Sequence, residues 1–180
     1  MRFARSAKQV VHWDRLKTPV DHAAFAIATA LGAGLFPKAP GTMGAIFGLP
    51  LAYWLSGVDV TLAVAVIAGL TAAGTWSAKH LDTIMGTGDN QIIVMDEVIG
   101  VCITALTIER NPVLLFVAFV LFRFFDIVKI PPVRAIDRWS KNKGAWAGGF
   151  GVMADDIVAG LQGLFVIWGV SNLVALYFPA

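Results

Sequence analysis

Long apolar runs separated by short polar stretches dominate this chain. A helix that crosses a bilayer needs about 20 mostly apolar residues. Runs close to that length cover residues 58–78, 92–108, 111–128 and 157–179. This pattern predicts an all-α fold, a multi-span membrane helical bundle, rather than the buried core of a soluble helical protein.

Proline and glycine divide the apolar runs into helices. The apolar segment 23–36 is short and leads into Pro37 and Pro40, which prevent a continuous helix. We therefore expect 23–36 to be a re-entrant or interfacial segment instead of a full span. We expect a single domain, residues 1–180, that contains this segment and about five transmembrane helices. These helices are expected near residues 43–56, 58–78, 92–108, 112–128 and 153–178.

The distribution of charge orients this bundle in the membrane. Charged residues make up 14% of the chain, below the roughly 25% typical of soluble domains. Ten of the fourteen Lys and Arg residues lie in segments 1–22 and 129–143, and basic segments beside membrane spans favour the cytoplasm. The predicted cytoplasmic segments are 1–22, 37–42, 79–91 and 129–151, and the predicted outer turns are 56–59 and 109–112.

Five carboxylates lie at the edges of the apolar runs, where an ionised group is costly. Such residues usually pair, bind a metal or take part in chemistry. The predicted topology brings all five, and the 37–42 loop, to one membrane face, which indicates a shared site. Oxygen ligands without nearby His or Cys suit Mg²⁺ better than Zn²⁺. The five are Asp96, Glu97, Asp126, Asp155 and Asp156.

Each of these groups also has a simpler structural interpretation. Arg123, Asp126 and Lys129 share one helical face, so they form either a local ion-pair ladder or a metal ligand between two cations that attract phosphate. The pairs Asp96–Glu97 and Asp155–Asp156 would also suit the start of a helix.

Other polar and reactive residues are less informative. The loop 37–42 contains Lys38 and Thr42 and precedes a helix, whose start favours anions, although Thr42 can equally serve as a helix cap. Cys102, alone in an apolar run, is expected in the core, and no role is assigned to His80.

Four blocks of this sequence closely resemble the bacterial phosphatidylglycerophosphatase A family, over roughly residues 25–165. One departure is Ile130, where the family usually has Pro directly after the Lys. The matching blocks are Pro40-Gly41-Thr42-Met43-Gly44, Val94-Met95-Asp96-Glu97-Val98-Ile99-Gly100, Phe122-Arg123-Phe124-Phe125-Asp126-Ile127-Val128-Lys129 and Gly151-Val152-Met153-Ala154-Asp155-Asp156-Ile157-Val158-Ala159-Gly160.

The resemblance implies a Mg²⁺-dependent lipid phosphatase in the bacterial inner membrane. It would hydrolyse the terminal phosphate of phosphatidylglycerophosphate in the cytoplasmic leaflet. The acidic positions expected to bind metal or activate water are Asp96, Glu97, Asp126, Asp155 and Asp156. The positions that could contact phosphate are Lys38, Thr42, Arg123 and Lys129.

Two other classes of function remain open from the sequence. A cation transporter would use the carboxylates as ion ligands, nearer the bilayer midplane and along a continuous polar path. A non-catalytic assembly protein would use them only for structure. No basic and aromatic surface indicates nucleic acid as a partner.

Overall fold

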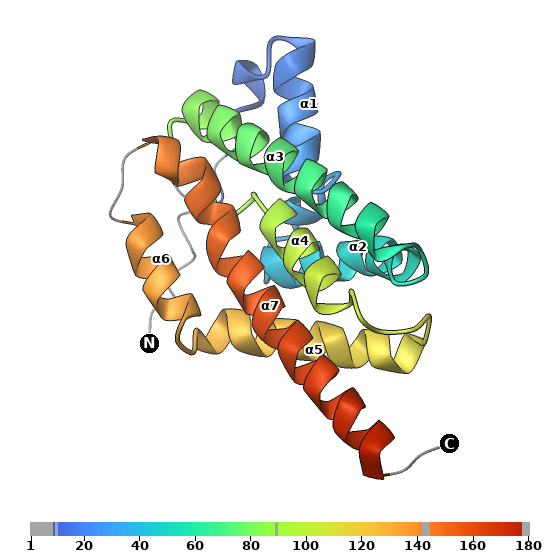
Figure 1. Ribbon diagram of the computed structural model, residues 1–180. Coiled ribbons are helices and arrows are strands. Elements are labelled where there is room, and N and C mark those ends of the chain that lie inside the picture. The colour runs from blue at the N-terminus through green and yellow to red at the C-terminus, as the bar shows by residue number, and fades with distance from the viewer. Residues whose placement is uncertain (1–8, 10, 89, 142–144, 178–180) are drawn as a thin grey trace.

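The computed structural model describes residues 9, 11–88, 90–141 and 145–177, and these are helical with short connections. The basic residues Arg2, Arg5 and Lys8 of the predicted N-terminal segment lie outside the described residues. Figure 1 shows α7 running diagonally across the molecule, with α4 near its centre. The helices are η1 (Trp13–Arg15), α1 (Pro19–Ala28), η2 (Ala33–Leu35), α2 (Pro40–Leu55), α3 (Val60–Met85), α4 (Met95–Thr104), α5 (Pro112–Val128), α6 (Val133–Lys141) and α7 (Ala145–Tyr177).

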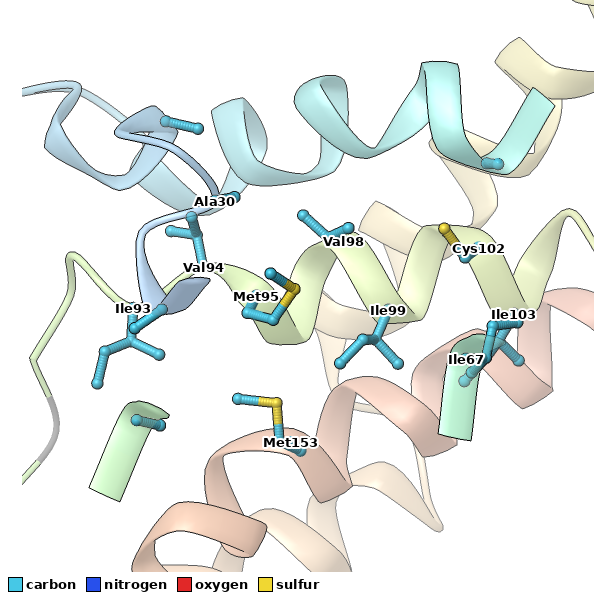
Figure 2. Packing of buried hydrophobic residues seen from close by; sticks show 14 of the residues in the cluster. Ala30, Ile67, Ile93, Val94, Met95, Val98, Ile99, Cys102, Ile103 and Met153 are labelled. Atoms are coloured by element: carbon cyan, nitrogen blue, oxygen red, sulfur yellow. The ribbon is translucent and has the colours of Figure 1, made fainter. Parts of the chain in front are cut away.

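Helix α4 is the buried centre of the bundle. All of its residues except Asp96 and Glu97 are buried, and it packs mainly against α2 and α7. In Figure 2 the side chains of Met95 and Ile99 lie on the side of α4 that faces Met153 of α7. At 1.5 Å per residue, ten helical residues extend about 15 Å, half of a hydrocarbon core of about 30 Å. The helix is therefore shorter than the span predicted over 92–108, and that span is not confirmed.

The five-span count is not confirmed. Among the described helices, α3 and residues 150–177 of α7 are long and apolar enough to cross a membrane. Helices α2 and α5 are apolar but have 16 and 17 residues. The segment 23–36 does not form one helix, because α1 ends at Ala28 and a turn leads into η2, in agreement with the expected short element.

The two polar stretches predicted as loops are largely helical. Helix α3 continues through residues 79–85, because Leu81 and Met85 lie one turn apart and are both buried. Residues 133–141 form α6, whose Val133 is fully buried, and α7 begins within the second stretch. The expected break around Pro37 is confirmed, since α2 begins at Pro40.

Glycine allows α4 to approach α5 and α7 closely. A Cβ on Gly100 would lie 2.2 Å from Cε2 of Phe122 and 3.0 Å from the carbonyl oxygen of Asp156, and one on Gly160 would lie 2.6 Å from the Gly100 carbonyl oxygen. The Thr104 hydroxyl lies 3.0 Å from the Gly100 carbonyl oxygen and 3.2 Å from that of Gly160. Small residues allow such close packing in membrane bundles. The close packing at Gly100 and Gly160 fixes α4 against the acidic part of α7.

The two turns predicted on the outer side lie together. The side chain of Arg110 lies against Gly57, where a Cβ would be 1.7 Å from its Nε atom. Because α2 and α4 both lead towards these turns, the starts of the two helices lie at the other end of the bundle. Asp96 and Glu97, in the first turn of α4, lie at that end.

A polar contact missed from the sequence joins α1 to α3. The Nε2 atom of His80 lies 2.9 Å from Oδ1 of Asp21, whose other oxygen accepts the backbone N–H of Thr18 at 2.8 Å. These hydrogen bonds, above all the one with His80, hold the pKa of Asp21 below its ordinary value. None of the five carboxylates takes part in this contact, which joins the two helices.

Candidate active site

Three carboxylates from two helices meet at the start of α4. One oxygen from each of Asp96, Glu97 and Asp156 can be chosen so that all three lie within 4.8 Å of one another. Asp156 is 4% exposed, and Asp96 and Glu97 are partly buried. We call these residues the carboxylate cluster. Adjacent residues on a helix point about 100° apart, yet Asp96 and Glu97 both contribute to it, because Asp156 approaches from the neighbouring helix α7.

Helix α5 adds an ion pair beside the cluster. Nη1 of Arg123 lies 2.6 Å from Oδ2 of Asp126, and both side chains are about 15% exposed. Asp126 is close enough to interact electrostatically with Glu97 and Asp156. Among the described atoms, Oε2 of Glu97 and Nε of Arg123 are buried without a hydrogen-bond partner. Buried polar atoms are rarely left in this state, so these two indicate a missing ligand.

A second ion-pair group lies at the end of α5. The ammonium group of Lys129 donates to Oδ2 of Asp155 at 2.8 Å and to Oδ1 of Asp137 on α6. Burial by itself disfavours the charged amine, but the hydrogen bonds to Asp137 and Asp155 outweigh it and raise the pKa of Lys129 above its ordinary value. Lys129 therefore remains charged at neutral pH and ties α5, α6 and α7 together.

A cavity of about 430 Å³ opens beside the cluster. The side chains of Asp96, Glu97 and Arg123 line it, together with the start of α2. At Gly41, a Cβ would be 2.0 Å from Oε1 of Glu97 and 3.5 Å from Nη1 of Arg123. The missing side chain at Gly41 thus leaves room for the carboxylate, and the positive end of the α2 dipole lies at the same cavity.

Of the four residues predicted to contact phosphate, Arg123 lines the cavity, whereas Lys38, Thr42 and Lys129 lie outside this lining. Lys129 instead binds Asp137 and Asp155. Lys38 is exposed on the loop before α2, and Thr42 lies in the first turn of α2. Thr42 does not cap the helix, since Ala39 is the N-cap residue. Likewise Asp155 and Asp156 do not start a helix, because α7 begins ten residues earlier, at Ala145. These two structural interpretations are therefore wrong.

The sequence also missed members of the site. Asn90 and Gln91 line the cavity, and Asp137 binds Lys129. Asp137 lay in a stretch interpreted as a loop, and its spacing of one helical turn from Val133 is compatible with a helix but does not indicate Lys129 as its partner. Cys102 is buried in the core, as expected.

Known proteins resemble this chain over most of its length. Residues 26–171 match the family model described as Phosphatidylglycerophosphatase A. A Haemophilus influenzae phosphatidylglycerophosphatase A is 34% identical over 149 residues, which cover 81% of this chain and 86% of that protein. The Escherichia coli phosphatidylglycerophosphatase A is 33% identical over 147 residues, covering 81% and 82%. A Bacteroides thetaiotaomicron protein, provisionally named a phosphatidylinositol-3-phosphatase, is 35% identical over 149 residues, covering 78% and 89%. No solved structure is significantly similar.

These relatives carry the names of phosphatases, and nothing in the comparisons supports a cation transporter. The relatives and the two long apolar helices indicate a membrane protein. The matched residues include the whole carboxylate cluster, Arg123 and Lys129. The chain belongs to the phosphatidylglycerophosphatase A family, and it is an enzyme of the phosphatase class.

Proposed function

We propose that this enzyme hydrolyses the terminal phosphate of phosphatidylglycerophosphate to give phosphatidylglycerol, with Mg²⁺ as its cofactor. The observation that carries the proposal is the carboxylate cluster beside Arg123, at a cavity of about 430 Å³. The cavity would admit the phosphorylated headgroup, while the acyl chains remain in the bilayer. We place the site at the cytoplasmic face of the bacterial inner membrane, since the basic segments of the sequence favour that side.

The cluster has the chemistry of a Mg²⁺ site. Its ligand atoms are all carboxylate oxygens, which hard cations prefer, and Oε2 of Glu97 has no partner among the described atoms. Two ionised carboxylate oxygens lie at most 4.8 Å apart, and at that distance two unit charges repel by about 3.5 kcal/mol at an effective dielectric constant of 20. A cation held by Asp96, Glu97 and Asp156 would relieve this repulsion. When bound, Mg²⁺ would polarise the phosphoryl oxygens and neutralise part of their charge.

The side chains around the cluster would supply the remaining functions. Arg123, oriented by Asp126, stabilises negative charge that develops on the phosphoryl oxygens. The start of α2 adds the positive end of a helix dipole, and Lys38 and Thr42, on the same segment, would meet the headgroup as it enters.

We favour direct attack by water. Its oxygen bonds to phosphorus, the bond from phosphorus to the glycerol oxygen breaks, and a carboxylate takes the proton from the water. The proton that the carboxylate has taken passes to the glycerol oxygen, which leaves as the free alcohol, and the water oxygen remains on the released inorganic phosphate.

Phosphate release from phosphatidylglycerophosphate by the detergent-purified protein tests this function. We expect release that stops with EDTA and returns with added Mg²⁺. Asp126→Asn should abolish it, whereas Glu109→Gln, which changes an exposed acid away from the site, should not. Phosphatidylinositol 3-phosphate is assayed in parallel, because one relative is named for it. Chelator-resistant release would contradict the metal assignment, and preferred release from the inositol lipid would contradict the substrate.

A further inference from the structure

Asp137 on α6 is outside every motif assigned above, yet it shares the ammonium group of Lys129 with Asp155. Asp155 in turn precedes Asp156, a member of the carboxylate cluster. Lys129 thus connects a helix outside the cluster to the acidic part of α7. Both Asp137 and Asp155 have side chains that are 15% exposed, against 30% for Lys129.

The arrangement limits the positions available to Lys129. An ammonium group has three N–H donors, and two of them are directed to Asp137 and Asp155. Lysine has a flexible four-carbon stem, so the loss of one partner would release the amine to other rotamers. Among the described side chains the third donor has no partner, and the partly exposed side chain leaves it accessible to a ligand.

The docking of α6 does not depend on Asp137. Val133 is fully buried in an apolar cluster with Phe122 and Ala159. Nε2 of Gln162 on α7 also donates to the carbonyl oxygen of Pro131 at 3.1 Å. These contacts hold the start of α6 against α5 and α7 without the acid. The ion pair is therefore better explained by its effect on Lys129 than by the stability of α6.

We propose that Asp137 is a positioning residue, which orients Lys129 and through it fixes Asp155 at the edge of the active site. This inference rests on the proposed lipid phosphatase function. Asp137 does not touch the substrate, and its effect on turnover passes through the amine.

A double-mutant cycle on kcat/KM for phosphate release separates this role from a structural one. We expect Asp137→Ala to lower kcat/KM about 10- to 100-fold, as residues that orient a ligating group commonly do. Lys129→Ala should lower it by at least as much. In the Lys129→Ala background, Asp137→Ala should have no further effect, because the residue through which it acts is absent. Asp137→Glu should recover most of the activity.

The controls keep the outcomes distinct. Arg138→Ala changes an exposed charge on the same helix and should leave kcat/KM near that of the parent. If Asp137→Ala does not fold, Asp137→Asn takes its place in the cycle, because it keeps the side-chain volume. Multiplicative losses in the double mutant, or full activity in Asp137→Ala, would overturn the inference. A parent enzyme that releases no phosphate would instead overturn the proposed function.

Discussion

The substitution Gly41→Ala is the sharpest test of the site, because it should lower activity while leaving stability nearly unchanged. In Gly41→Ala the new Cβ would lie 2.0 Å from Oε1 of Glu97. Ordinary contacts begin at 3.4 Å, so the carboxylate must retreat by about 1.4 Å. The atom that moves is the end of a flexible side chain, and the backbone of α2 can stay in place.

The size of the loss follows from this displacement. A misplacement of about 1 Å in a catalytic constellation can cost about 10²-fold in rate, equivalent to about 2.7 kcal/mol in the activation barrier. We therefore expect kcat/KM to fall about 100-fold in Gly41→Ala. Stability should change little, since alanine in place of a helical glycine contributes up to about 1 kcal/mol of helix propensity, which offsets the cost of moving Glu97.

Two measurements on the same preparation decide the matter: phosphate release at saturating Mg²⁺, and the midpoint of thermal unfolding in detergent. Gly69→Ala is the matched control, since Gly69 lies on α3 and a Cβ there meets nothing within 4 Å. It should retain full activity. A Gly41→Ala enzyme with the activity of the parent would refute the argument, because Glu97 would then not need its present position.

Three further changes test other parts of the structure. Gly100→Ala places a Cβ 2.2 Å from the fully buried ring of Phe122; we expect a loss of about 1–3 kcal/mol in unfolding free energy, and an unchanged thermal midpoint would show that this packing adjusts freely. The bond with His80 lowers the pKa of Asp21, so ionised Asp21 stabilises the fold above its unfolded pKa of about 3.9, and this contribution fades as the pH falls below about 4. Asp21→Asn should lower the midpoint at pH 7, and its difference from the parent should narrow in acid; a constant difference would contradict the linkage. Asp96→Asn should abolish phosphate release while the protein remains folded, and near-normal release would remove Asp96 from the site.

The helical class and several breaks could be predicted from sequence, because they depend on local properties. The apolar runs predicted α5 from residue 112 and placed the start of α2 at residue 43, three residues after its observed start at Pro40. The length of α4 could not be predicted in this way. Its apolar residues are typical of a membrane span, but they are buried by α2, α3, α5 and α7, which all contact α4. Hydropathy does not distinguish a protein interior from lipid. Tertiary packing likewise stabilises α6 as a helix, because its apolar residue Val133 is buried against Phe122 of α5. The sequence does not show this contact.

The site was partly predictable for a related reason. Acidic residues in apolar surroundings are conspicuous in a sequence, and the direction of each span brought Asp96, Glu97 and Asp156 to one end of the bundle. Which carboxylates meet depends on how the helices are rotated, and close contacts such as Gly100 against α7 decide that rotation. For the same reason Asp137 could not be assigned to Lys129 from the sequence alone.

The five carboxylates differ in how the protein compensates their negative charge, and this difference indicates where a bound cation is most needed. Asp96 and Glu97 lie in the first turn of α4, where the helix dipole favours negative charge. Asp126 is paired with Arg123, and Asp155 with Lys129. Asp156 lies inside α7, far from either helix end, is 4% exposed, and forms no ion pair with a Lys or Arg in the described part of the chain. Burial of an unpaired ionised carboxylate is the most costly of these arrangements. Asp156 is therefore the carboxylate whose negative charge the protein compensates least. A bound Mg²⁺ would stabilise the ionised form of this residue most.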